Sequence, residues 1–195
     1  MLGRLRRFRS YLRISGVASI SRRYFVMNSF DGAMAMLGVV VGAYSSGALN
    51  PRIVVSAGLG AAIAMGASGF SGAYLTERAE RRRKLLVIRK AMLTDVSNSI
   101  HGRAMKVAVI WAALIDGLSP MLAAIVPMIP FLLNFASIIS VDQAVWYSVF
   151  SILCILFLLG AFLGKISKES KLRSGARMVA VAILVAFVSW LIGGL

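Results

Sequence analysis

The stretch that decides the fold is NSFDGAMAMLGVVVG, residues 28–42, an apolar run with one carboxylate, Asp31, near its start. The apolar character continues around the whole helix, which is typical of a segment buried in hydrocarbon. An ionisable side chain in such a helix costs about 2.5–3.5 kcal/mol or more, and it marks a functional site by default. Asp31 therefore predicts either an ion path at a helix–helix contact or a hydrogen bond to a neighbouring helix.

The composition agrees with a membrane protein. Of the 195 residues, 59% are hydrophobic, whereas soluble domains contain about 45–50%. We predict an all-α integral membrane protein with five transmembrane helices of about 20 residues each. The expected spans are residues 24–49, 53–75, 107–133, 144–163 and 178–195.

Positive charge is concentrated in three blocks of the chain, whose formal net charge is +15. Seven Lys and Arg residues lie in residues 1–23, nine in residues 78–106 and five in residues 165–177. The positive-inside rule places all three blocks in the cytoplasm, with the N-terminus inside and the C-terminus outside. This pattern predicts a prokaryotic plasma-membrane protein whose basic loops face anionic inner-leaflet lipid, and it gives little support to nucleic-acid binding.

The charge pattern also divides the chain into four segments. Residues 1–23 form a basic, weakly amphipathic N-terminal segment, which we expect to lie as a helix on anionic headgroups. Residues 24–76 hold spans one and two, and residues 107–195 hold spans three to five. Between them, residues 77–106 predict a short basic amphipathic cytoplasmic helix. Three prolines, Pro120, Pro127 and Pro130, could break the third span near its outer end.

Small residues recur at helical spacing in the first two spans. Gly38 and Gly42 form a GxxxG pair, and Ser56, Gly60, Ala64, Ser68 and Gly72 form a row with a period of four. Such spacing lets membrane helices approach closely. The row is expected to pack against the first span or against its copy in a partner subunit, and we predict a homodimer.

Four potential metal ligands fall at a similar depth in the expected spans. At 1.5 Å per residue, Asp31 lies roughly 10 Å from the cytoplasmic end, and Met34, Met65 and Asp116 lie roughly 15 Å from it. Carboxylate oxygen together with thioether sulfur suits a borderline transition metal better than Ca²⁺ or Mg²⁺. Each methionine taken singly could equally be a core filler.

A second acidic pair lies just below the second span. Glu77 and Glu80 share a helix face, where they could collect a cation at the cytoplasmic mouth or form salt bridges with Arg81, Arg83 and Lys84. The sequence shows no Ser/His/Asp set, no phosphate-binding loop and no Cys/His cluster. We therefore predict a protein that is not an enzyme and carries no resident cofactor.

Four stretches resemble the vacuolar iron transporter family. They are FDGAMAMLGVVVGA, GFSGAYLTERAER, ALIDGLSPMLAAIVPMIPFLL and LRSGARMVAVAILVAFVSWLIGGL. The resemblance implies a five-span homodimer that exports Fe²⁺ or Mn²⁺ from the cytosol in exchange for protons. It assigns Asp31 as the first-span carboxylate and Met65 as the second-span methionine.

The chain resembles a variant of that family that lacks the acidic cytoplasmic metal-binding insert. In its place stands a short basic segment, which keeps Glu77, Glu80, Met92 and Asp95 as possible remnants. Two hypotheses follow. The first is a proton-coupled divalent-metal exporter with a path at the dimer interface. The second is a non-transporting membrane protein of the same fold, which binds anionic lipid or an acidic partner through its basic face.

Overall fold

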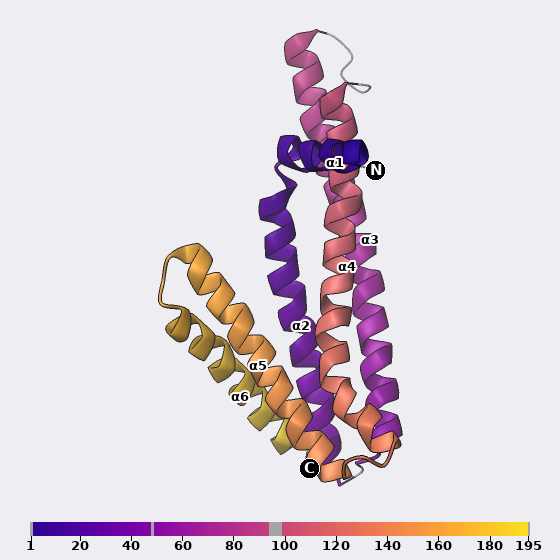
Figure 1. The fold of residues 1–195 in the computed structure, drawn as a ribbon, viewed down its shortest axis with the longest axis vertical. Helices are drawn as coiled ribbons and strands as arrows, with labels where there is room; N and C mark the ends of the chain where they lie inside the picture. The colour runs from indigo at the N-terminus through magenta and orange to yellow at the C-terminus, as the bar shows by residue number, and fades with distance from the viewer. Residues whose placement is uncertain (1, 48, 94–98, 195) are drawn as a thin grey trace. The chain divides into compact units, whose positions relative to one another are not determined.

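The computed structural model describes residues 2–47, 49–93 and 99–194, with only the backbone described for residues 2–7. Within these residues the secondary structure is entirely α-helical (Figure 1). The helices are α1 (Leu2–Ser15), α2 (Val17–Ser45), α3 (Pro51–Met92), α4 (Ile100–Phe135), α5 (Val141–Ser167) and α6 (Lys171–Gly193). The all-α class is therefore confirmed for the part of the chain that the structure describes.

Five of these helices, α2 to α6, are long and apolar enough to cross a membrane. Each contains most or all of one span predicted from the sequence, so five candidate membrane spans are confirmed, whereas their orientation stays a prediction. The α6 helix has 23 residues, which gives a length of about 35 Å, close to the thickness of the hydrocarbon core. The α3 helix has 42 residues, or about 63 Å, and therefore extends well beyond that core.

The predicted separate helix over residues 77–106 does not form as such. Residues 77–92 continue α3 without a break, and residues 100–106 begin α4. Between Gly72 and Gly102 the sequence contains neither glycine nor proline, so nothing stops the helix where the apolar span ends. The last described residue after α3 is Leu93, which has a positive φ of 54°. Residues 94–98, including Asp95, lie outside the described residues.

The α4 helix passes through all three of its prolines, so the expectation of a break near its outer end is wrong. A proline lacks the N–H that would bond the carbonyl four residues earlier. Membrane helices tolerate this loss where neighbouring segments pack around the proline. Pro120 and Pro127 are both fully buried, which is the environment that this tolerance requires.

The chain forms two compact units, of which the first comprises Met1–Phe25 and Gly66–Leu118. In this unit α1 lies across α3 and α4 (Figure 1). The Phe8 ring packs edge-on against Trp111 of α4 with 5.5 Å between ring centroids, and Leu12 packs on a small buried cluster that includes Val17 and Ala108. Arg9 and Arg13 remain exposed. The N-terminal segment is thus helical over residues 2–15, whereas its contact with headgroups stays a prediction.

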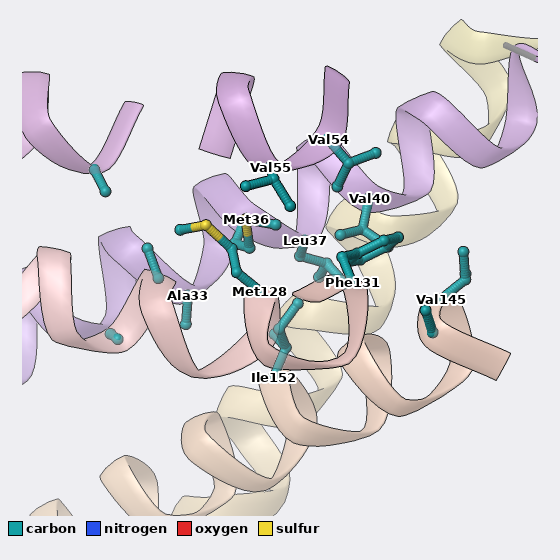
Figure 2. Close-up of a cluster of buried hydrophobic side chains, with 14 of the residues drawn as sticks. Ala33, Met36, Leu37, Val40, Val54, Val55, Met128, Phe131, Val145 and Ile152 are labelled. Atoms are coloured by element: carbon teal, nitrogen blue, oxygen red, sulfur yellow. The ribbon is translucent and has the colours of Figure 1, made fainter. Parts of the chain in front are cut away.

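The second unit comprises Val26–Met65 and Ser119–Leu195. Its core gathers apolar side chains from α2, α3, α4 and α5 (Figure 2). They include Ala33, Met36, Leu37, Val40, Val54, Val55, Met128, Phe131, Val145 and Ile152. The α5 and α6 helices form an antiparallel hairpin whose contact depends on small residues, because a Cβ on Gly160 would lie 2.5 Å from the Ser174 carbonyl oxygen.

Candidate cation sites and a buried ion pair

Asp31 lies on the surface of its own chain. Its residue is exposed, and it forms no side-chain hydrogen bond or ion pair within the described residues. The next residue, Gly32, is buried against α4, where an added Cβ would lie 2.7 Å from the Pro120 Cα. The Asp-Gly pair therefore combines a tight backbone contact with a carboxylate that nothing in its own unit covers.

The methionines of the second unit divide into packing and partly exposed residues. Met34 and Met65 are partly exposed, and Met34 also packs against the core. Met36 and Met128 are buried, and a Cβ on Gly58 would lie 2.7 Å and 3.4 Å from their sulfur atoms. Met34 and Met65 keep exposed area, but so do Met27, Met121 and Met178 of the same unit, so exposure alone does not single out the two predicted ligands.

Asp116 belongs to the first unit and is buried, with 8% of the residue exposed. A Cβ on Gly69 of α3 would lie 3.1 Å from both its carboxylate Oδ2 and its carbonyl oxygen. The following residue, Gly117, approaches α3 equally closely, since its Cβ would lie 2.7 Å from the Gly66 carbonyl oxygen. Glycines on both helices thus bring α3 and α4 together around the Asp116 carboxylate.

Glu77 forms a buried ion pair with Arg81, one helical turn further along α3. The Arg81 Nε donates to Glu77 Oε2 at 3.0 Å, and the Tyr24 hydroxyl donates to Glu77 Oε1 at 3.2 Å. The two residues are 7% and 3% exposed, respectively. For Glu77 the salt-bridge alternative is therefore the arrangement that the structure contains.

Arg81 also reaches two other helices. Its Nη1 donates to the Ser15 carbonyl oxygen at 3.1 Å and to the Met105 sulfur at 3.4 Å. The first unit thus contains a buried polar network that joins α1, α2, α3 and α4.

Glu80 lies outside this network. It pairs with Lys84 at 3.7 Å, and both side chains are about half exposed. Within the described residues, no group of three or more His, Cys, Asp and Glu residues could hold a metal ion. Asp31, Met34 and Met65 belong to one unit, and Glu77, Glu80 and Asp116 belong to the other. Their role as a common metal site and their shared depth stay predictions.

Sequence reasoning missed three members of the network, which are the Tyr24 hydroxyl, the Ser15 carbonyl and the Met105 sulfur. The Glu77–Arg81 pair has the spacing of four residues that predicts a contact on one helix face. Tyr24 is separated from Glu77 by 53 positions, and no local pattern marks it. Only the tertiary packing of α2 against α3 brings these two residues together.

Comparisons with known proteins identify the family of this chain. The VIT family profile matches residues 83–194, which is more than half of the sequence. An uncharacterized protein of Methanocaldococcus jannaschii is 36% identical over 174 residues, covering 87% of both proteins. The five long apolar helices found above agree with an integral membrane protein. The chain belongs to the VIT family of membrane metal transporters.

Proposed function

We propose that the protein is a proton-coupled exporter of Fe²⁺ or Mn²⁺, with Asp31 as the carboxylate that binds the ion. The observation that carries this proposal is the exposure of Asp31 on its own chain, within a helix apolar enough to span the membrane. A carboxylate facing lipid would cost several kcal/mol. A partner subunit or a water-filled path that covers Asp31 would remove that cost.

A second copy of the chain is the partner that the small-residue row favours. Ser56, Gly60, Ala64, Ser68 and Gly72 are all exposed along one face of α3, and a Cβ on Gly60 or Gly72 would meet no atom within 4 Å. In contrast, Gly38 and Gly42 lie near α6 of the same chain, because a Cβ on Gly193 would lie 3.1 Å from the Gly42 carbonyl oxygen. The α3 row is therefore the stronger basis for the proposed homodimer.

In such a dimer, two Asp31 carboxylates balance the charge of one divalent ion. Met34 and Met65 would add soft thioether ligands, which favour transition metals over Mg²⁺ and Ca²⁺. On the return step each Asp31 can carry a proton in place of the metal, which couples the two fluxes. Asp116, buried at the α3–α4 contact, is proposed as a proton relay. The three basic blocks favour an orientation with these loops in the cytoplasm of a prokaryotic cell, and the proposed export runs outward from that side.

The test is metal flux in proteoliposomes that contain the full chain, measured for Fe²⁺, Mn²⁺, Co²⁺ and Zn²⁺ under an imposed proton gradient. Asp31→Asn keeps size and hydrogen bonding but removes the charge, and we expect flux to fall at least a hundredfold. Asp142→Asn is the matched control, because Asp142 is exposed in the first turn of α5. Flux of wild-type size in the Asp31 variant would refute the mechanism.

The second hypothesis, a non-transporting protein of the same fold, is favoured by the state of Glu77. This acidic residue is paired with Arg81, so residues 77–92 of α3 carry mainly positive charge, which could bind anionic lipid or an acidic partner. Vesicles of neutral lipid and vesicles rich in anionic lipid distinguish the two functions. Absence of flux for all four metals, together with saturable retention of anionic lipid, would favour the second hypothesis.

A further inference from the structure

We propose that Arg81 is a resident cation which competes with the transported metal for Glu77 and, while bound there, holds α1 against α3 and α4. This inference rests on the proposed metal transport, and it adds a residue and a moving part that the transport proposal does not contain. Arg81 acts as a positioning residue, since its guanidinium contacts the candidate metal ligand and the end of α1 at the same time.

The Glu77 carboxylate has no free oxygen in this arrangement. Tyr24 donates to Oε1 at 3.2 Å, and Arg81 donates to Oε2 at 3.0 Å. A carboxylate with both oxygens occupied and a full positive charge beside it has little affinity for a divalent ion. A metal can therefore bind Glu77 only if the guanidinium leaves.

The same guanidinium holds the end of α1. Its Nη1 donates at 3.1 Å to the carbonyl oxygen of Ser15, the last residue of that helix. A cation at the C-terminus of a helix also interacts favourably with the helix dipole. Gly16, with a φ of +63°, follows immediately and separates α1 from α2. Such a joint lets α1 change direction without unwinding α2.

Loss of Glu77 as a partner would leave Arg81 as a buried cation with only neutral acceptors, a costly state. Its Nη2 already has no hydrogen-bond partner among the described residues, so the guanidinium is incompletely satisfied even when paired. Metal on Glu77 therefore expels Arg81 and breaks its bond to Ser15. An undocked α1 has 14 residues, a length at which isolated helices are marginal in water.

The coupling must work in both directions. If metal at Glu77 loosens α1, then docking of α1 must weaken metal binding at Glu77 by the same factor. The docked helix thus keeps the site closed to weakly held ions.

The first experiment measures amide hydrogen exchange of residues 8–16 in the full chain in lipid nanodiscs without metal. Arg81→Met keeps much of the side-chain length but removes the charge, and we expect exchange to rise about tenfold or more, as for a lost charged hydrogen bond. Lys84→Met is the matched control, because Lys84 forms an exposed ion pair with Glu80 on the same helix. We expect no change in α1 for this control.

Arg81→Lys is a second variant that keeps the test valid if Arg81→Met does not fold. A lysine keeps the positive charge beside Glu77, but it lacks the fork that reaches two acceptors at once. We expect the lysine variant to fold and still show faster exchange in α1. Unchanged exchange in folded Arg81→Lys and Arg81→Met would overturn the proposal, because the Ser15 bond would then not hold α1.

The second experiment adds Mn²⁺ to the wild-type protein and follows both α1 exchange and Mn²⁺ binding by electron paramagnetic resonance. We expect Mn²⁺ to accelerate α1 exchange in the wild-type protein and Glu169→Gln to keep that response. Glu77→Gln should show fast α1 exchange before Mn²⁺ is added, because Arg81 has lost its carboxylate partner, and no further rise when Mn²⁺ is added. Glu169 is a fair control because its carboxylate forms an exposed ion pair with Arg177. Bound Mn²⁺ without any response of α1 would overturn the coupling.

These outcomes are separable from those of the transport test. Loss of flux in Asp31→Asn, together with an α1 that does not respond to Mn²⁺, would support transport. The same result would refute the proposed coupling of metal binding at Glu77 to release of α1 by Arg81, which we call the Arg81 switch. Absence of flux in wild-type protein would refute the proposed transport, and if α1 then also ignored Mn²⁺, the switch would fall with it. A wild-type α1 that responds to Mn²⁺ only when Glu77 is intact supports the switch.

Discussion

Gly32 of α2 lies directly against the backbone of Pro120 in α4. A Cβ on the glycine would lie 2.7 Å from the Pro120 Cα and still closer to its carbonyl oxygen. Backbone cannot give way as a flexible side chain can. We expect Gly32→Ala to lower the free energy of unfolding by about 1–3 kcal/mol. Thermal unfolding in detergent measures this loss, and Gly42→Ala, at a site with no atom within 4 Å, should stay near the wild-type value.

The Tyr24 hydroxyl should stabilise the fold through Glu77. Tyr24→Phe deletes the donor to Glu77 Oε1 and leaves a buried carboxylate with one fewer partner. A hydrogen bond to a charged group contributes about 1.5–3 kcal/mol, and we expect that decrease in the free energy of unfolding. Tyr44→Phe is the control, since Tyr44 is 44% exposed. Equal stability of the two variants would show that the Glu77 contact contributes nothing.

The exposed row on α3 should govern association. Gly60→Leu places a large side chain where close approach of a second helix is expected, while the single chain has open space at that position. We expect the dimer to dissociate at least tenfold more readily, as measured by single-molecule photobleaching in lipid at varied dilution. Cys154→Leu, at an exposed position on α5, should leave the dimer intact. Association of wild-type strength in Gly60→Leu would exclude this face.

The partly exposed methionine of α3 should set metal preference. Met65→Leu removes a soft ligand without changing charge, so it should not imitate the loss expected for Asp31→Asn. We expect a several-fold lower flux of Fe²⁺ relative to Mn²⁺, because the harder ion depends less on thioether sulfur. Parallel flux assays with both metals measure this ratio. An unchanged ratio would assign Met65 to packing.

The orientation of the chain is tested by labelling single cysteines. In a Cys154→Ser background, Gln143 and Ser170 lie at the N-terminal ends of α5 and α6, on either side of a 27-residue span. The positive-inside rule places Gln143 outside and Ser170 inside. An impermeant maleimide added to intact cells should label only a cysteine at position 143. Labelling at position 170 from outside would invert the topology.

Much of the fold could be predicted from hydrophobic run lengths, because a span needs about 20 apolar residues whatever its partners. The end of a helix follows a different rule. The α3 helix continues past Leu75 to Met92, since charged residues do not stop a helix without a glycine or proline. In the same way, α4 keeps its helix through Pro130, which depends on packing that a single sequence does not reveal.

The candidate site residues could also be predicted only in part from the sequence. The spacing of Glu77 and Arg81 left a cation ligand and a salt bridge equally open; the structure contains the salt bridge, and cation binding by Glu77 stays a prediction. The exposure of Asp31 could not be predicted, because it depends on which face of α2 the rest of the chain covers. Tyr24 is joined to Glu77 only by tertiary contact.

Two glycines that directly follow an aspartate, Gly32 and Gly117, have a consequence for protein redesign. Gly32 and Gly117, each directly after a membrane aspartate, bring their helices against the backbone of a neighbour. Close main-chain contact therefore holds the backbone next to the Asp31 and Asp116 carboxylates. Replacing either aspartate by glutamate would move the charge by one carbon–carbon bond while the backbone stays in place. At each position, the distance from the backbone to the carboxylate can thus be varied without changing the helix–helix contact beside it.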